Sequence, residues 1–205
     1  IVFHLGMSGR LRLYKKLDLK NNIHDHFLIE TNNERFLVFN DPRRFGFIDY
    51  GLYNIINSRK YLTSLGIDAL SIALDGPYLF FKISKSIVPI KQILLNQTII
   101  AGIGNIYASE ILFNAKISPL KRGKDLKLSN CNIICKSTKR ILKKAINSGG
   151  STLRDFVATD GTLGNFQSNF KVYNQEGKKI GDDEVKKIVQ YGRSTFYCPK
   201  LQNNK

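Results

Sequence analysis

The sequence predicts an α+β protein that begins as a partial antiparallel β-sandwich, continues as a helical domain and ends in short strands. Residues 1 to about 55 hold consecutive β-like segments separated by turn residues, which favours an antiparallel sandwich or barrel. From about residue 90 the apolar residues take helical spacing. After residue 156 a glycine-rich loop precedes two short β-like segments. These changes of pattern together indicate the fold class.

The N-terminal strands are expected at residues 2–5, 11–14, 26–30, 35–39 and 45–50. Between the third and fourth, Thr31-Asn32-Asn33-Glu34 is typical of a hairpin turn. Ile1-Val2-Phe3 has the composition of the middle of a strand. We therefore expect an N-terminally incomplete piece whose sandwich lacks its first strands.

Helices are expected after a transitional stretch, residues 56–86, in which Gly66 and Gly76-Pro77 act as breakers. The first expected helix carries Ile90, Ile93 and Leu94 on one face. The second begins at Asn105, its expected N-cap, and runs to residue 113.

The longest helix is expected over about 129–147. Helical spacing predicts four buried side chains, those of Ile134, Ile141, Leu142 and Ala145. Its other face is basic and fits either a solvated surface or a polyanion contact. Gly149-Gly150 ends the helix, and a short helix is expected from Ser151 or Thr152 to Phe156. The glycine-rich loop at 159–165 and strands at 170–173 and 194–197 complete the chain.

The charge balance points to a polyanion partner. The 205 residues include 32 Lys+Arg and 16 Asp+Glu, a net charge of +16, and the basic residues are spread along the chain. A basic ribosomal-type protein would have the same balance, so charge alone does not separate an enzyme from a binding protein. No apolar run is long enough to span a membrane. Three cysteines make no disulfide framework, which fits a reducing compartment.

Two short segments combine glycines with probe-like side chains. Asp41-Pro42-Arg43-Arg44-Phe45-Gly46 offers planar, permanently charged arginines beside an aromatic ring. His4-Leu5-Gly6-Met7-Ser8-Gly9 offers a methionine between glycines. Met7 and Phe45 are the kind of apolar wedge that proteins insert into base stacks. The alternative for the first segment is an ordinary type I turn with Pro at its second position.

A third segment, residues 100–110, places Gly102 and Gly104 just before the helix expected from Asn105. Free backbone amides and the helix dipole at such a turn favour an anion, so it can bind a phosphate. An ordinary helix corner that needs glycine for tight packing would have the same sequence.

On the basis of these segments, the chain resembles the formamidopyrimidine-DNA glycosylase (Fpg/MutM) family, and more distantly endonuclease VIII. Seven motifs occur in family order with near-family spacing: HLGMSG at 4–9, HDH at 24–26, DPRRFG at 41–46, AGIGNIYASE at 101–110, ISP at 117–119, GGSTLRDF at 149–156 and GRSTFYCP at 192–199. DPRRFG favours the formamidopyrimidine branch.

The resemblance implies a DNA base-excision repair glycosylase with AP lyase activity on oxidised purines, such as 8-oxoguanine and formamidopyrimidines. It implies a β-sandwich domain at 1–62, a helix–two-turn–helix domain at 63–158, and a lesion loop with a β-hairpin finger at 159–205. The partner would be damaged double-stranded DNA, bound by a monomer. The location would be a bacterial cytoplasm, associated with the nucleoid, or an organelle.

The resemblance also implies roles for particular residues. Met7, Arg43 and Phe45 would fill the gap left by an extruded base, with Arg43 bound to the orphaned cytosine. Backbone phosphates would be contacted by His24 and Asn105. Lys91, or Lys82 and Lys85 just upstream, would add further phosphate contacts. Arg193 would bind phosphate and assist the second elimination step.

One departure from the family concerns the catalytic amine. The family's nucleophile is an N-terminal proline followed by glutamate, with a lysine before HLGMSG, and these 205 residues contain none of the three. An α-amine titrates about two pH units below lysine and can form a Schiff base with the sugar. We therefore expect the 205-residue chain to be inactive, whereas a full-length parent beginning with Pro-Glu would be active.

The other departure concerns the finger, which in the family binds one zinc through two Cys-x-x-Cys pairs. Here Cys198 is a lone remnant, Leu201 stands at its partner's position, and residues 178–183 contain no cysteine. We expect no metal and no other cofactor, with the hairpin held by apolar packing of Val185, Ile188, Phe196 and Tyr197. Both departures leave open an alternative, a non-catalytic damaged-DNA-binding remnant of such an enzyme.

Overall fold

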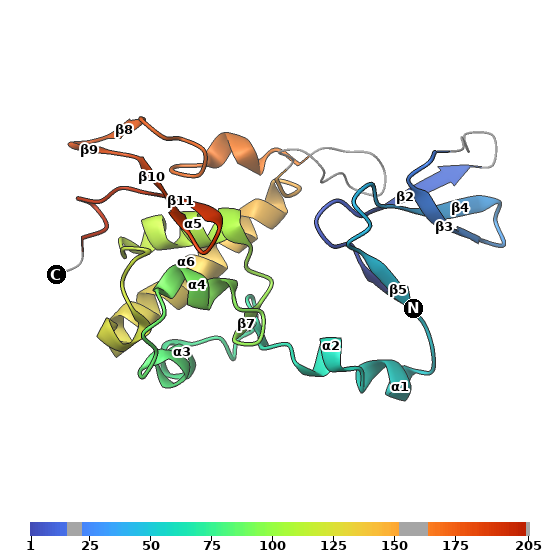
Figure 1. Ribbon diagram of the computed structural model, residues 1–205, viewed down its shortest axis with the longest axis horizontal. Helices are drawn as coiled ribbons and strands as arrows, with labels where there is room; N and C mark the ends of the chain where they lie inside the picture. Colours follow the sequence, from blue (N-terminus) through green and yellow to red (C-terminus); the bar gives the residue numbers. More distant parts are fainter. Residues whose placement is uncertain (16–21, 152–163, 204–205) are drawn as a thin grey trace. The chain divides into compact units, whose positions relative to one another are not determined.

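The computed structural model describes residues 1–15, 22–151 and 164–203 (Figure 1). Its internal contacts divide the chain into two compact units. Unit 1 contains Ile1–Thr63 and Ala145–Ser168, and unit 2 contains Ser64–Lys144 and Asn169–Lys205. The domain boundaries expected from the sequence stay predictions.

Unit 1 is built mainly from strands that lie where the β-like segments of the sequence predict them. Its strands and short helices are β1 (Val2–His4), β2 (Arg10–Lys15), β3 (Asp25–Glu30), β4 (Arg35–Asn40), β5 (Phe47–Asp49), α1 (Tyr53–Asn57) and α2 (Lys60–Thr63). β5 is shorter than expected, because residues 45 and 46 still belong to the preceding loop.

Two antiparallel sheets form in unit 1. One has the order β2-β4-β3, and the other pairs β1 with β5. Val38 and Phe39 on the central strand are buried, and the Phe39 ring lies 6.4 Å from that of Phe3 on β1. The rings connect the two sheets, so the antiparallel β-region expected from the sequence is confirmed.

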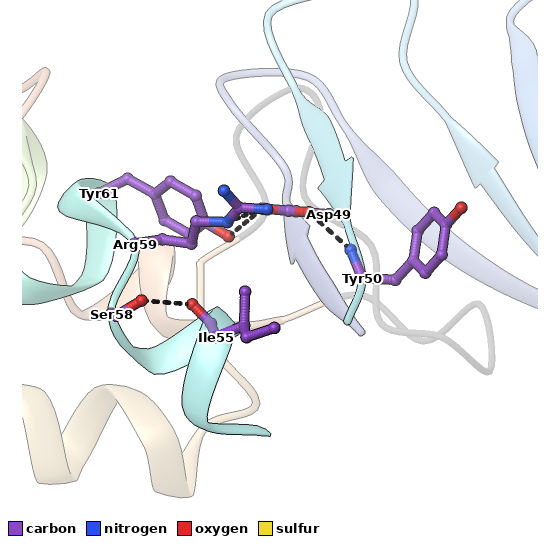
Figure 2. A network of polar contacts seen from close by, with 6 residues as sticks. All are labelled: Asp49, Tyr50, Ile55, Ser58, Arg59 and Tyr61. Atoms are coloured by element: carbon purple, nitrogen blue, oxygen red, sulfur yellow. Dashed lines mark hydrogen bonds and ion pairs between the residues drawn. The ribbon is translucent and has the colours of Figure 1, made fainter. Parts of the chain in front are cut away.

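A polar network holds the end of β5 against the short helices, as Figure 2 shows. The Tyr61 hydroxyl donates to Asp49 Oδ2 at 2.8 Å, and Arg59 Nε lies 3.2 Å from the same oxygen. The Tyr61 bond and the Arg59 charge hold the pKa of the Asp49 carboxyl below its usual value, although partial burial opposes them. The Phe47 ring stacks on His4 and meets Tyr61 edge-on. β5 is therefore held on both sides.

Unit 2 contains the helical part of the chain and the C-terminal hairpins (Figure 1). Its elements are β6 (Ile67–Asp68), α3 (Gly76–Ile83), α4 (Ile90–Leu95), β7 (Ile100–Ala101), α5 (Asn105–Ala115), the 3-10 turn Gly123–Asp125, most of α6 (Leu128–Asn147), β8 (Lys179–Ile180), β9 (Asp183–Glu184), β10 (Lys186–Gln190) and β11 (Arg193–Tyr197). A further 3-10 turn, Phe166–Asn169, spans the division between the units.

Helix α3 lies where the sequence suggested a break. Gly76 and Pro77 begin this helix instead of interrupting the chain. Asp75 is its N-cap and accepts a hydrogen bond from the Tyr78 amide at 2.8 Å. Proline fits the first turn of a helix because its missing N–H would have no partner there.

Asn105 is not the N-cap of α5. The helix begins at Asn105, and Gly104 precedes it as a cap without a side-chain hydrogen bond. The Asn105 side chain is used elsewhere, because its Nδ2 donates to the Ser194 carbonyl at 3.1 Å. A contact between distant segments therefore replaces the expected local cap.

Residues 170–173 do not form the expected strand. The amides of Lys171, Val172 and Tyr173 all point at the Glu110 carboxylate of α5, at 2.8–3.1 Å. Glu110 is buried, so these hydrogen bonds satisfy a charge that would otherwise be unpaired. The segment folds around one side chain and pairs with no strand.

Helix α6 agrees closely with the prediction. All four residues expected to face inward are buried. Gly149 and Gly150 end the helix with positive φ angles, and the Gly150 amide donates to the Ala145 carbonyl. The exposed face carries Lys136, Arg140, Lys143 and Lys144, so both interpretations of that face stay open. The short helix expected at 152–156 and most of the loop at 159–165 lie outside the described residues.

Among the described residues, none of the helices combines the length and apolarity that crossing a bilayer requires.

Candidate nucleic-acid interface

The two glycine-containing segments of unit 1 meet around the carboxylate of Asp41. This side chain is buried and accepts from Ser8 Oγ at 2.6 Å and from the Gly46 amide at 2.7 Å. Ser8 in turn accepts from the Arg43 amide at 3.2 Å. Burial alone would raise the pKa of Asp41, but hydrogen bonds from Ser8 and from backbone amides hold it below its usual value. One ionised carboxylate thus joins both segments.

Glycine is required where the two segments touch. A Cβ on Gly6 would lie 2.8 Å from the Phe45 carbonyl carbon, and Gly6 has a φ of +60°. A Cβ on Gly46 would lie 2.5 Å from the His4 carbonyl oxygen. These close approaches fix how the residue-4–9 and residue-41–46 segments present their side chains.

The side chains expected to probe DNA are exposed on these two packed segments. Met7 is 67% exposed and Phe45 is 57% exposed. The Arg43 guanidinium carbon lies 4.9 Å from the centre of the Phe45 ring, in cation–π contact. Exposed apolar side chains that gather on one patch mark interaction sites, whereas scattered single ones do not. Met7, Arg43 and Phe45 therefore form one exposed group, which we call the probe cluster.

His24 lies close to Asp41, whose carboxylate joins the two segments. Its carbonyl accepts from the Asp41 amide at 2.9 Å, and its partly exposed side chain lies in the turn just before β3, the strand that contains His26. His26 Nε2 lies 2.9 Å from the Asp41 carbonyl oxygen. The structure therefore brings His24 into the segment network that holds the probe cluster.

Lys91 in unit 2 occupies a position unlike the one expected. It is fully buried, and its ammonium donates to the Ser194 carbonyl at 3.0 Å and to Thr195 Oγ1 at 2.6 Å. Burial, with a smaller contribution from the Arg193 charge, lowers the pKa of Lys91 to about 8. The ammonium has no exposed surface in this structure, and the phosphate contact expected of Lys91 stays a prediction. Lys91 attaches the last hairpin to α4.

Asn105, Lys91 and Arg193 come together at the start of β11. Asn105 donates to the carbonyl of Ser194, the same atom that Lys91 contacts. Arg193 immediately precedes Ser194, and its side chain is exposed. Lys85 is exposed in the turn after α3, and no contact joins it to this group among the described residues.

The finger does not offer a zinc site of the family's type. Burial raises the pKa of the Cys198 thiol to about 11, so it is not a ready thiolate ligand. The Asp183 carboxylate already accepts backbone N–H groups from Glu184, Lys200 and Leu201, at 2.7–2.9 Å. Within residues 1–15, 22–151 and 164–203, no three His, Cys, Asp or Glu side chains gather as a metal set. The residues present do not fit zinc.

Apolar packing holds the finger together in part as expected. Val185 and Phe196 are buried in a small core with Val172 and Cys198, whereas Ile188 and Tyr197 are only half-buried. Asp183 adds polar closure, since its bonds to the amides of Lys200 and Leu201 join β9 to the turn after β11.

Several organising residues received no role from the sequence. Asp41 and Ser8 lie inside recognised motifs, yet only the structure shows that they bond each other across 33 positions. Glu110 is likewise part of a motif whose buried carboxylate orders residues 171–173. The one available signal was that all three residues lie within recognised motifs.

Comparisons with known proteins agree with this architecture. Residues 1–48 match the formamidopyrimidine-DNA glycosylase N-terminal domain, and residues 65–157 match the formamidopyrimidine-DNA glycosylase H2TH domain. A formamidopyrimidine-DNA glycosylase of Zymomonas mobilis is 41% identical over 203 residues, covering 98% of this chain and 74% of the relative. One from Wolbachia pipientis is 40% identical over 205 residues, covering 99% and 74%.

Solved structures cover the chain to the same extent as these relatives. Lactococcus lactis Fpg in complex with DNA containing an abasic site has a TM-score of 0.88 at 33% identity, covering 98% of this chain and 74% of that one. A structure of MutM with DNA containing carbocyclic 8-oxo-G has a TM-score of 0.86 at 33% identity, with the same coverage. The α+β architecture expected from the sequence is thereby confirmed, and the chain belongs to the formamidopyrimidine-DNA glycosylase family of DNA repair proteins.

Proposed function

We propose that this chain recognises oxidised purines, such as 8-oxoguanine and formamidopyrimidines, in duplex DNA, as part of a glycosylase with AP lyase activity. The observation that carries the proposal is the probe cluster: Met7, Arg43 and Phe45, exposed together on a base organised by buried Asp41. The bound DNA lesions of the similar solved structures support the choice of ligand.

The probe cluster has the chemistry that base extrusion requires. Taking a base out of the duplex costs a few kcal/mol of stacking and pairing. Met7 and Phe45 can replace lost stacking contacts with apolar surface. Arg43 presents a planar set of donors, which can bind the acceptors of the orphaned cytosine. Its cation–π contact with Phe45 orders the guanidinium before DNA arrives.

Phosphate contacts would orient the duplex on this cluster. We assign them to His24 in unit 1 and to Asn105, Lys85 and Arg193 in unit 2. Arg193 is exposed next to a carbonyl that Asn105 and Lys91 both contact, which supports a fixed backbone position for the residue. The family resemblance adds that Arg193 assists the second elimination step. Monomeric action in a bacterial cytoplasm or organelle belongs to the same proposal.

Binding and catalysis need separate tests. The catalytic amine implied by the family is an N-terminal proline, so we propose that a polypeptide of these 205 residues binds damaged DNA without forming a Schiff base. Borohydride trapping on an abasic duplex measures that step directly. Trapped covalent complex would contradict the proposed inactivity, whereas binding without trapping is also what a non-catalytic remnant would show.

The experiment that tests recognition compares two duplexes at fixed salt, one with a non-cleavable abasic analogue opposite cytosine and one undamaged. Salt must be fixed because phosphate contacts alone let a basic protein bind DNA. We expect tighter binding to the damaged duplex, and loss of this preference in Met7→Ala and Phe45→Ala. Equal binding of both duplexes by the unaltered chain would contradict the proposal.

A further inference from the structure

The hairpin of β10 and β11 has an unusual residue at its tip. Gln190 pairs with Arg193, so only Tyr191 and Gly192 connect the two strands. Both have positive φ, +49° and +74°, as in a two-residue type I′ turn. Glycine, asparagine and aspartate suit the first position of such a turn, whereas a tyrosine there is strained.

Packing among the described residues does little to offset this strain. The Tyr191 side chain is 71% exposed, and Val189 beside it is exposed to the same extent. Strained residues that gain nothing from the fold are often kept for binding or catalysis. Two exposed apolar side chains at the tip of a rigid hairpin are therefore candidates for contact with a partner.

The base of the hairpin is firmly held. Thr195 Oγ1 donates to Gln190 Oε1 at 2.9 Å, and both side chains are buried. Lys91 donates to the same Thr195 hydroxyl, and Gln190 Nε2 donates to the Pro119 carbonyl at 3.4 Å. The tip is anchored by residues on each side of the turn. A side chain presented from such a base loses little further freedom on binding.

The charge beside the tip indicates the partner. Arg193 directly follows the turn, and Lys186 and Lys187 are exposed at the opposite end of the preceding strand, where they pair with Tyr197 and Phe196. An aromatic ring beside cationic side chains is the combination with which proteins bind exposed bases, the ring by stacking and the cations through phosphate. An acidic protein surface would use the cations but would give the ring no flat partner.

We propose that Tyr191 is a DNA-contacting residue that stacks its ring on a base or sugar beside the phosphate held by Arg193. This inference rests on the proposed function, since it requires that the chain bind DNA. It adds a contact made by the hairpin tip, separate from the probe cluster of unit 1.

The test uses the opposite effects that one substitution should have on folding and on binding. Tyr191→Asn places a residue suited to positive φ in the turn, so the thermal midpoint of unfolding should stay the same or rise. The same variant loses the ring, so its affinity for the abasic duplex should fall about tenfold, within the range measured for stacked bases. Tyr191→Phe keeps the ring and should bind within twofold of the unaltered chain.

A matched control separates this effect from the loss of any exposed tyrosine. Tyr53 is 86% exposed in α1, and Tyr53→Asn should leave DNA affinity unchanged. The dependence of affinity on salt should also be unchanged in Tyr191→Asn, because no charge is removed.

Each outcome decides one point. Full affinity in Tyr191→Asn, or equal losses in Tyr191→Phe and Tyr191→Asn, would overturn the stacking role while leaving the proposed function intact. Failure of the unaltered chain to prefer the abasic duplex would instead contradict the proposed function. A lower midpoint for Tyr191→Asn would contradict the claim that the tyrosine is kept at a cost to the turn.

Discussion

Replacing Asp41 tests whether one carboxylate organises the surface that probes DNA. Its two oxygens accept from Ser8 Oγ and the Gly46 amide at 2.6 and 2.7 Å. Each hydrogen bond to a charged group contributes about 1.5–3 kcal/mol. In Asp41→Asn the Ser8 hydroxyl can turn and accept from the new amide, so both contacts persist without charge assistance. Since charge assistance supplies about half of each bond, the expected loss is about 2 kcal/mol.

Asp41→Ala removes both bonds and leaves the Gly46 amide without an acceptor. The expected loss in unfolding free energy is therefore larger, about 3–6 kcal/mol. Glu30→Gln is the matched control, because Glu30 is exposed on β3 and carries the same charge. A surface change of this kind should alter stability by less than about 0.5 kcal/mol.

The assay is urea unfolding followed by far-ultraviolet circular dichroism, with amide exchange of β2–β5 as a local measure of unit 1. Binding to abasic and undamaged duplexes is then compared under conditions where each variant is folded. We expect Asp41→Asn to lose part of its preference for the abasic duplex, because the probe cluster rests on Asp41. Unchanged stability together with unchanged preference would refute this reasoning.

Three further predictions concern the pKa of Asp41, the burial of Lys91 and the hydrogen bonds of Asp183. The stability difference between the unaltered chain and Asp41→Asn should be full above pH 4 and should shrink as pH falls through the lowered folded-state pKa, as urea unfolding at pH 6 and pH 3 would reveal. Lys91→Met should leave the salt dependence of DNA binding unchanged, whereas Arg193→Ala should reduce its logarithmic slope by about 0.9; equal slopes in both would contradict the burial of Lys91. Asp183→Asn should speed amide exchange in the finger at least about tenfold, equivalent to about 1.4 kcal/mol. The variant Asp182→Asn, at the exposed neighbouring residue, should leave the exchange rate unchanged. If a zinc chelator removed the protection of the finger amides in the unaltered chain, the finger would depend on metal and this prediction would be contradicted.

The sequence was sufficient for the parts of the fold that depend on local pattern. Strands β1–β4 could be predicted because short apolar runs lie between turn residues, and helix α6 because its apolar residues have helical spacing. The motif loops were recognisable because glycine allows backbone conformations that other residues avoid and proline fixes φ. The pair Gly76-Pro77 was ambiguous for the same reason, since these residues occur both in turns and at helix starts.

The remaining features depend on contacts between distant residues, which no local pattern encodes. Lysine is ordinarily a surface residue, and the burial of Lys91 follows only from the position of Ser194 and Thr195, more than 100 residues away. Residues 171–173 have β-like composition, but their backbone amides donate to the Glu110 carboxylate and not to a neighbouring strand. The probe cluster itself was predicted from the motif, whereas the role of Asp41 beneath it required the structure.

The most direct test of the central claim is the binding of the Arg43→Ala variant to a duplex with an abasic analogue opposite cytosine, compared with an undamaged duplex at the same salt. We expect the unaltered chain to prefer the damaged duplex and Arg43→Ala to bind both nearly alike, since the donors to the orphaned cytosine are gone. If Arg43→Ala keeps the full preference, the probe cluster does not recognise the lesion.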